Sequence, residues 1–318
     1  MKLENDKTLV RSTRAAYADA LLQLGAETDD IVVLDADLSE STMTCKFAEK
    51  YADKFYNMGI AEQNMMGTAA GLATCGFIPI CSTFSVFACL RSGEQVRTSI
   101  AYPKLNVKIV TTHSGLSIGT AGATHFCEED LAIMRAIPNM TVIAPSDYLE
   151  TIKAVKAAVA YPGPVYIRLG RGDAPVLYSE LEDYQIGKAI TYKVGSDITL
   201  IAAGVMMQRA ITAAYLLEAK GVSCRVIDMH TIKPFDYEIV EKAAKETKAI
   251  ITLEEHNVNG GLGSAVAETV AAMKGEKAVV KILGIPDVFG GVAAAELLWD
   301  SYHMDADSVC NIALDLLR

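Results

Sequence analysis

The stretch NMGIAEQNMMGTAAGLATCG, residues 57–76, predicts a short extended segment, then a turn at Gly59 and then a helix built mainly from small residues. Glu62 falls in the first turn of that helix, and Gly67 and Gly71 lie inside it. Each interior glycine destabilises a helix by about 1 kcal/mol relative to alanine. The pattern therefore predicts that another backbone or a flat ligand comes close, with Glu62 as the acid at that contact. The alternative is that Glu62 only complements the dipole at a helix N-terminus.

The composition of the 318-residue chain favours a globular protein of two domains. Hydrophobic residues make up 51% of the sequence, enough for large cores, and charged residues 21%. The formal net charge of −10 would repel a nucleic-acid backbone or an anionic membrane surface. The N-terminus lacks the apolar core of a signal peptide, and no run reaches the roughly 20 apolar residues of a membrane span. We expect a soluble cytoplasmic protein that binds neither nucleic acid nor membrane.

The seven cysteines are scattered along the chain without a C-x-x-C pair, at positions 45, 75, 81, 89, 127, 224 and 310. An odd, irregular set in a chain without a leader favours reduced thiols over disulfides or a zinc site. We expect most of them to fill the core.

Short apolar runs alternate with helical patterns from end to end, which indicates parallel α/β layers. In the first half, strands are predicted at residues 31–34, 55–58, 78–81, 107–112, 141–144 and 165–169. A polar, turn-rich connection over residues 178–196 follows. The alternation then restarts, with strands predicted at 198–203, 223–229, 249–254 and 279–283 and a final helix at 306–317. We predict two parallel-sheet-rich α/β domains, residues 1–187 and 188–318.

Polar residues that follow predicted strands are the first candidates for a site, because open α/β sheets bind ligands at the carboxyl ends of their strands. Asp35 and Asp37 follow the first strand, where an aspartate also often caps the next helix. Ser41, just beyond them, could bind an anion. Arg11 and Arg14 precede the apolar face of a first helix; an anionic partner would explain them, and so would a solvated pair of cations.

A long loop rich in glycine and hydroxyl side chains follows the strand at 107–112 and contains His113 and His125. Proton transfer or phosphate recognition suits these histidines better than zinc, because no third ligand lies at close spacing. Phe84 and Phe87 lie three residues apart, on one face of a helix or turn. They are either core residues or a stacking surface for a flat heterocycle.

Arg168 and Arg171 end a strand in YIRLGRGDAP, where they could bind a phosphate in bidentate fashion. The alternative for Arg171 is a surface ion pair with Asp173. In the second half, His230 and His256 lie in strand-to-helix turns, and we expect them to be structural or to lie at an interface.

These stretches, in this order, resemble the C-terminal half of transketolase, as found in bacteria that encode the enzyme as two subunits. The resemblance covers nearly the whole chain and implies a pyrimidine-binding domain followed by the transketolase C-terminal domain. No single motif is decisive, but the order and spacing are specific: STRAAYADAL, DADLSES, MGIAEQN, STFSVF, TTHSGLSIGTAGATH, RAIPNMTVIAPSD, IRLGRGD, DMHTIKPFD and EEHNVNGGLGSA.

The resemblance implies a role for each matching position. Glu62 falls where the family's glutamate contacts the pyrimidine ring nitrogen of thiamine diphosphate, so it is expected to be catalytic as well as cofactor-binding. Phe84 and Phe87 match the aromatic residues packed around that ring, and His125 matches a histidine assigned to proton transfer. Asp37 matches an acid near the cofactor and the subunit contact. The positions that match the family's sugar-phosphate site are Arg14, Ser41, His113 and Arg171.

The resemblance also implies a partner. The family holds the diphosphate and Mg²⁺ through a Gly-Asp-Gly segment and a downstream Asn on a separate domain, and no Gly-Asp-Gly occurs here. We therefore expect an N-terminal subunit that holds the diphosphate and the metal, in an α2β2 heterotetramer with self-association of this chain. No metal ligand is expected in this chain itself.

One departure from the family bears on the substrate. Residues 119–122 read Gly-Thr-Ala-Gly where the family usually has Gly-Glu-Asp-Gly, so Ala121 replaces an Asp that bonds a substrate hydroxyl. A charged hydrogen bond of this kind is often worth about 1.5–3 kcal/mol. Phe126 replaces a usual Gln, and Cys89 and Leu90 stand in the region of a usual Tyr. These changes leave room for an unusual donor, such as a branched ketose phosphate (apulose 4-phosphate) or a sulfonated ketose.

Our leading hypothesis is a transferase subunit that moves a two-carbon ketol unit between sugar phosphates. The β subunit of a 2-oxoacid dehydrogenase and a deoxyxylulose phosphate synthase share the domain layout and remain alternatives. Arg14, Ser41 and Arg171 favour a sugar phosphate over a 2-oxoacid. A non-catalytic scaffold subunit is a third alternative, against which the intact Glu62 argues.

Overall fold

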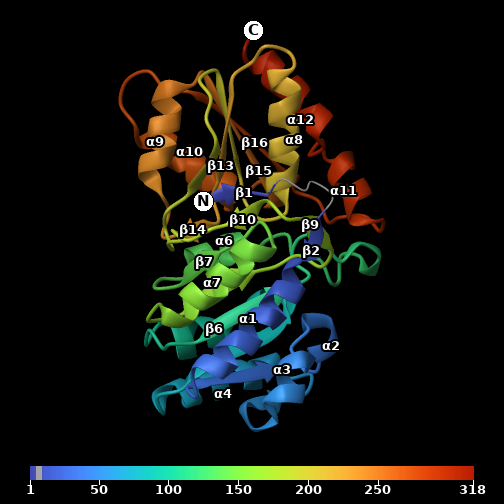
Figure 1. Ribbon diagram of the computed structural model, residues 1–318, viewed down its shortest axis with the longest axis vertical. Coiled ribbons are helices and arrows are strands. Elements are labelled where there is room, and N and C mark those ends of the chain that lie inside the picture. The colour runs from blue at the N-terminus through green and yellow to red at the C-terminus, as the bar shows by residue number, and fades with distance from the viewer. Residues whose placement is uncertain (5–8) are drawn as a thin grey trace.

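The computed structural model describes residues 1–4 and 9–318. It contains two α/β units stacked along the long axis of the molecule, with the first half of the chain in one and most of the second half in the other (Figure 1). The main sheets have seven and five strands, and most neighbouring strands run parallel. The predicted fold class, two parallel-sheet-rich α/β domains, is confirmed.

The seven-stranded sheet has the order β14-β7-β8-β6-β5-β3-β4. Its strands are β3 (Ile31–Asp35), β4 (Phe55–Asn57), β5 (Ile78–Phe84), β6 (Lys108–Thr112), β7 (Thr141–Ile143), β8 (Val165–Arg168) and β14 (Thr231–Lys233). All six strands predicted in the first half are present, within a few residues at their ends. β14 was not predicted: it comes from the second half of the chain and pairs antiparallel with β7.

Alternate residues of the strands point to opposite faces of this sheet, so each face has its own core. Ile31 and Val33 pack against α1, α3 and α7, whereas Val32 and Leu34 belong to the core that includes α4 and α6. The helices of this half are α1 (Thr13–Glu27), α2 (Ser39–Thr42), α3 (Cys45–Lys50), α4 (Glu62–Thr74), α5 (Gly93–Gln95), α6 (Asp130–Ala136) and α7 (Tyr148–Ala160). Short 3-10 turns η1 (Ala52–Lys54) and η4 (Gly119–Ala121) and π-helical turns η2 (Phe87–Arg91) and η3 (Val96–Ala101) complete it.

The five-stranded sheet has the order β11-β13-β12-β15-β16. Its strands are β11 (Ile190–Lys193), β12 (Ile198–Ala202), β13 (Cys224–Asp228), β15 (Ala249–Asn257) and β16 (Val279–Ile285). In Figure 1, α9 and α10 lie on one side of this sheet and α8 and α12 on the other. The helices are α8 (Met206–Glu218), α9 (Tyr237–Glu246), α10 (Leu262–Ala272), α11 (Ala295–Ser301) and α12 (Ala306–Leu316).

The predicted irregular connection over residues 178–196 was wrong in part, because two strands lie within it. β10 (Tyr178–Glu180) pairs with β1 (Lys2–Leu3), and β11 forms the antiparallel edge of the second sheet. A second two-stranded ribbon joins β2 (Val10–Ser12) to β9 (Asp173–Pro175). We still propose a domain boundary between residues 187 and 188, since it falls between β10 and β11.

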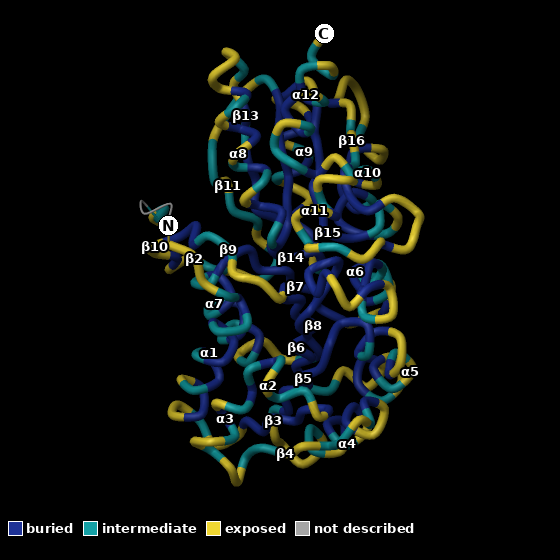
Figure 2. Tube along the Cα trace, turned by 90° about the vertical axis from the view of Figure 1, so that its right-hand side faces the viewer, coloured by how far each residue is buried: buried dark blue, intermediate teal, exposed yellow. Residues whose placement is uncertain are grey.

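The two units share a polar joint, visible as a buried band between them in Figure 2. Arg168 at the end of β8 pairs with Asp130 of α6 and donates to the backbone oxygen of Glu255 in β15, with an Nη2–O distance of 2.5 Å. His256 accepts from the backbone N–H of Ala132 across the same joint. His256 therefore lies at an interface, which was one of the two predicted possibilities.

All seven cysteines are free thiols, and five of them are buried, as expected of core residues. Within the described ranges, no helix combines the length and the apolar character needed to cross a membrane.

Candidate active site

The carboxyl ends of β3, β5, β6 and β8 meet at one edge of the larger sheet, because these strands are parallel neighbours. Phe84 ends β5, His113 follows β6, and Arg171 lies just beyond β8. The sheet therefore gathers residues that are far apart in the sequence.

Glu62 is the first residue of α4, after a turn in which Gly59 has a φ of 72°. The side chain of Glu62 is 1% exposed, and both of its carboxylate oxygens accept from Nη1 of Arg91, at 2.9 and 3.0 Å. Arg91 was not among the predicted site residues. Its spacing of four residues from Phe87 was the available signal, since residues so spaced on a helical turn can meet.

The two interior glycines of α4 do not make the predicted close contact within this chain. A Cβ atom at Gly67 or Gly71 would find no other atom within 4 Å, and both residues are exposed. The described residues of this chain therefore give no packing reason for these glycines.

Phe84 and Phe87 form a pair of stacked rings with centroids 5.8 Å apart. The ring of His113 lies 4.0 Å from that of Phe84. The ring of His125 lies edge-on to both phenylalanines, at 6.5 Å from Phe84 and 5.8 Å from Phe87. The guanidinium of Arg91 lies over Phe87, 4.4 Å from the ring centroid, which links Glu62 to this aromatic cluster.

A cavity of about 440 Å³ opens beside Phe84, which we call the arginine cavity. Four residues predicted to bind phosphate line it together, namely Arg14, Ser41, His113 and Arg171; its other lining residues are Glu40, Phe84, Ile118, Thr120 and Ala121. The β2–β9 ribbon brings Arg14 to Arg171, because it pairs Ser12 with Asp173. Arg14 donates from Nε to the backbone oxygen of Arg171 at 2.8 Å and from Nη1 to that of Ser41 at 2.7 Å.

The arginine cavity is cationic. Burial and the neighbouring charge of Arg171 lower the pKa of Arg14, while Asp173 opposes the shift. Burial, followed by the charges of Arg14, Arg171 and His125, lowers the pKa of His113 to about 3, so His113 is neutral at pH 7. The guanidinium of Arg171 makes no hydrogen bond or ion pair within the described part of the chain, so the expected alternative, an ion pair with Asp173, is not formed. Such a cavity suits an anion, although Glu40 also lines it.

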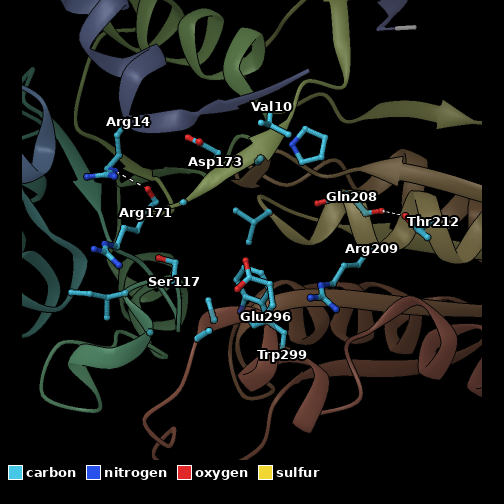
Figure 3. A pocket seen from close by; sticks show the side chains of 18 of the residues that line it. Val10, Arg14, Ser117, Arg171, Asp173, Gln208, Arg209, Thr212, Glu296 and Trp299 are labelled. Atoms are coloured by element: carbon cyan, nitrogen blue, oxygen red, sulfur yellow. Dashed lines mark hydrogen bonds between the residues drawn. The ribbon is translucent and has the colours of Figure 1, made fainter. Parts of the chain in front are cut away.

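A larger cavity of about 880 Å³ adjoins the arginine cavity and shares Arg14 and Arg171 with it. Figure 3 shows that these arginines lie on one side of it and that Arg209 and Trp299, from the second domain, lie on the other. Arg209 is paired with Asp300 at 2.6 Å. The arginine cavity therefore shares its arginine wall with a cavity that residues of both domains line.

Three of the other predicted candidates have structural roles or lie apart. Arg168 is 7% exposed and engaged by Asp130, so it is not available for phosphate. His230 is buried against the ring of Tyr184, with centroids 4.4 Å apart. Asp37 is exposed, has a φ of 63°, and accepts from Asn57 at 2.9 Å; it does not line the arginine cavity.

Asp35 has a structural role, although it is not the N-cap of the next helix, which begins after Leu38. It is buried and accepts from the backbone N–H of Leu38 and from the hydroxyls of Thr42 and Thr44. In residues 1–4 and 9–318, no three His, Cys, Asp or Glu side chains are arranged to hold a metal ion.

Comparison with known proteins identifies the family. A family model described as the transketolase pyrimidine-binding domain matches residues 10–176, and one described as the transketolase C-terminal domain matches residues 187–309. The chain belongs to the transketolase family.

Several relatives within the transketolase family match over nearly their whole length. The 6-deoxy-6-sulfo-D-fructose transketolase subunit SqwH of Clostridium sp. (strain MSTE9) is 39% identical, over 94% of this chain and 92% of its own. A subunit of the apulose-4-phosphate transketolase of Phocaeicola vulgatus is also 39% identical, over 96% of this chain and 97% of its own. A solved structure described as a split-gene transketolase, inactive β4 tetramer, is 47% identical with a TM-score of 0.89, over 96% of this chain and 98% of that one.

The transketolase family implies thiamine diphosphate as cofactor. The residues present in this chain fit the pyrimidine half of that molecule. A buried carboxylate, linked through one arginine to two stacked aromatic rings, matches the polar edge and flat faces of an aminopyrimidine. The only Gly-Asp pair, at residues 172 and 173, is taken up by the β2–β9 ribbon, where Asp173 pairs with Ser12. This chain thus has groups whose chemistry fits a pyrimidine, and its sequence lacks the family's Gly-Asp-Gly segment for the diphosphate.

Proposed function

We propose that this chain is the C-terminal subunit of a thiamine diphosphate-dependent transketolase that moves a two-carbon ketol unit between sugar phosphates. The observation that carries the proposal is the buried Glu62, linked through Arg91 to the stacked Phe84 and Phe87, with Phe84 lining a cavity that contains two arginines. Thiamine diphosphate, when bound, supplies an electron sink for breaking and forming carbon–carbon bonds beside a carbonyl.

The proposed roles rest on the family resemblance together with the contacts described above. Glu62 would bind the edge of the pyrimidine ring and control the protonation of that ring. The two phenylalanines would pack against the face of the same ring. His125, edge-on to both rings and half-buried, would exchange a proton with substrate or cofactor. Asp37 is proposed to contact the cofactor region from the subunit interface. The proposed ligands of the substrate phosphate are Arg14, Ser41, His113 and Arg171.

We propose that activity requires an N-terminal subunit, in an α2β2 assembly in which copies of this chain also associate. That subunit would hold the diphosphate and Mg²⁺, for which this chain lacks the Gly-Asp-Gly segment. The exposed Gly67 and Gly71 would then face another chain. Two relatives are named as transketolase subunits, and the β4 tetramer of a split-gene relative is described as inactive, which supports the need for a partner. Within this proposal the assembly acts in the cytoplasm.

The donor sugar is proposed to be unusual. Ala121 lines the arginine cavity at the position where the family usually has an Asp, so the cavity lacks that carboxylate. Two relatives are named for a sulfonated fructose and for apulose 4-phosphate, which support a sulfonated or branched donor.

Reconstitution tests the proposed function. The chain and its N-terminal partner, with thiamine diphosphate and Mg²⁺, should transfer ketol units only when both subunits are present. Apulose 4-phosphate and 6-deoxy-6-sulfofructose are assayed against xylulose 5-phosphate; strong activity on xylulose 5-phosphate alone contradicts the unusual donor. Decarboxylation of a 2-oxoacid with acyl transfer to lipoamide would instead support a dehydrogenase β subunit.

Glu62→Gln in that complex should lower turnover by roughly 10²- to 10⁴-fold, the usual contribution of an acid–base group. Glu94→Gln is the matched control, because Glu94 is exposed and bonds only to neighbours on its own helical segment. Full turnover by Glu62→Gln would favour a scaffold subunit.

A further inference from the structure

Arg91 is the hydrogen-bonding partner of the buried Glu62 carboxylate. The Glu62 side chain is 1% exposed, whereas that of Arg91 is 47% exposed, so the arginine is the solvent-facing member of the pair. Among the described residues, no other side chain donates a hydrogen bond to this carboxylate. A buried carboxylate without a partner is strongly destabilising, so Arg91 stabilises Glu62 in the chain alone.

The guanidinium of Arg91 also lies against the aromatic pair. Its central carbon is 4.4 Å from the Phe87 centroid, while Nη1 is 2.9 Å from one oxygen of Glu62 and 3.0 Å from the other. A guanidinium is planar, has N–H donors at its edge and stacks on aromatic faces. It therefore makes the same two kinds of contact that an aminopyrimidine would make with Glu62 and Phe87.

A flat ring that needs the carboxylate edge and the Phe87 face competes with this guanidinium. The Arg91 side chain can move away from Glu62 into solvent, because Arg91 ends the π-helical turn η2 and about half of its side chain is already exposed. We propose that Arg91 is a displaceable placeholder for the cofactor's pyrimidine ring, an inference that rests on the proposed function of Glu62 and Phe87. In the chain alone it pairs with Glu62, and it leaves when the cofactor binds.

The apparent affinity for the cofactor equals the intrinsic affinity multiplied by the fraction of molecules in which Arg91 has already left Glu62, so the placeholder raises the dissociation constant. The test is calorimetric titration of thiamine diphosphate, at saturating Mg²⁺, into the complex of this chain with its N-terminal partner. Arg91→Met should lower the dissociation constant roughly tenfold. Arg97→Met, at an exposed arginine of the neighbouring turn η3, is the matched control and should leave it unchanged.

A second measurement does not depend on the cofactor. Arg91→Met should lower the melting temperature of the chain alone, because Glu62 loses its partner, and the double variant with Glu62→Gln should recover most of the loss. If Arg91→Met does not fold, Arg91→Lys serves instead. Its ammonium pairs with Glu62 but cannot lie flat on Phe87, so it should bind the cofactor more tightly than the native chain but less tightly than Arg91→Met.

Equal or weaker cofactor binding by Arg91→Met or, where that variant is not folded, by Arg91→Lys overturns the placeholder. Weaker binding would mean that Arg91 remains a part of the occupied site. Unchanged binding by Glu62→Gln overturns the role of Glu62 instead, and with it the proposed function. Failure of the placeholder proposal and failure of the proposed function therefore give different results in the same titration series.

Discussion

Arg168 and Arg171 lie three residues apart, yet their guanidinium groups have opposite surroundings. Arg168 is buried and pairs with Asp130, with an Nε–Oδ2 distance of 2.8 Å. Arg171 is exposed at the wall of the arginine cavity, and its guanidinium is free of partners in the ranges that the structure describes. An arginine that no side chain neutralises is available to an anionic ligand.

We predict that Arg171→Met raises KM for a phosphorylated donor roughly 10- to 100-fold, which corresponds to the loss of a charged hydrogen bond of about 1.5–3 kcal/mol. Steady-state kinetics on the reconstituted enzyme measures this. Arg11→Met is the control with the same change of charge, because Arg11 lies over Tyr148 and outside the cavity. An unchanged KM would show that the phosphate is bound elsewhere.

The position of Glu62 could be predicted from the sequence because a glycine turn before a helical pattern defines where the helix begins. The contact between Glu62 and Arg91 could not, since a long arginine side chain can turn toward the protein or toward solvent. Arg168 was misjudged for a related reason: its partner Asp130 is 38 residues away, and only the folded sheet brings the two together.

At the scale of elements, one short ribbon builds the arginine cavity. β2 leads directly into α1, and its pairing with β9 places the first turn of α1 beside the residues that follow β8. Ser12 is the last residue of β2 and the N-cap of α1, where its hydroxyl accepts from the backbone N–H groups of Arg14 and Ala15. The cap thus holds the backbone of a proposed phosphate ligand.

We predict that Ser12→Ala lowers the free energy of unfolding by about 1 kcal/mol, the usual effect of losing an N-cap. Ser12→Asp should retain most of the stability, because aspartate caps helices equally well. Urea denaturation followed by circular dichroism measures both variants. If alanine proves as stable as serine, the hydroxyl does not contribute to the start of α1.

The long central strands were predictable, and so were β4 and β7 of three residues each, whereas four other short strands were not. β3, β5, β6 and β8 have four to seven residues, nearly all of them buried, and such apolar runs stand out in a sequence. β2, β9, β10 and β14 have three residues each. Their sequences VRS, DAP, YSE and TIK form no apolar run, and their antiparallel partners lie far away along the chain.

At the scale of the whole molecule, acidic groups are buried where the two domains meet. Asp228, at the end of β13, accepts through Oδ2 from the hydroxyls of Ser146 and Tyr178, at 2.8 and 2.7 Å. Burial raises the pKa of Asp228 to about 7; the two hydrogen bonds oppose the shift, and the charge of Asp147 adds to it. Burial also raises the pKa of Glu150, which accepts from the same Ser146 hydroxyl.

The raised pKa of Asp228 determines the direction in which the stability of the fold changes with pH. Between about pH 4 and pH 7 the unfolded chain has lost the proton of Asp228 while the folded chain keeps it, so stability falls as the pH rises through this window. Asp228→Asn cannot ionise. We predict that its stability relative to the native chain increases from pH 4 to pH 8, by roughly 2–4 kcal/mol.

Urea unfolding at several pH values measures the effect of Asp228→Asn. The same substitution at Asp53, which is exposed, is the control and should show no such trend. A constant stability difference across the pH range would contradict the raised pKa.

β14 belongs by sequence to the second domain and by hydrogen bonding to the sheet of the first. A cut near residue 187 would leave the edge of β7 unpaired and exposed to other chains. For the same reason, the two halves of this subunit are not freely interchangeable modules. A recombination event that joined the first half to the C-terminal domain of a distant relative would also have to supply a strand that fits β7, so inheritance of the two halves is coupled.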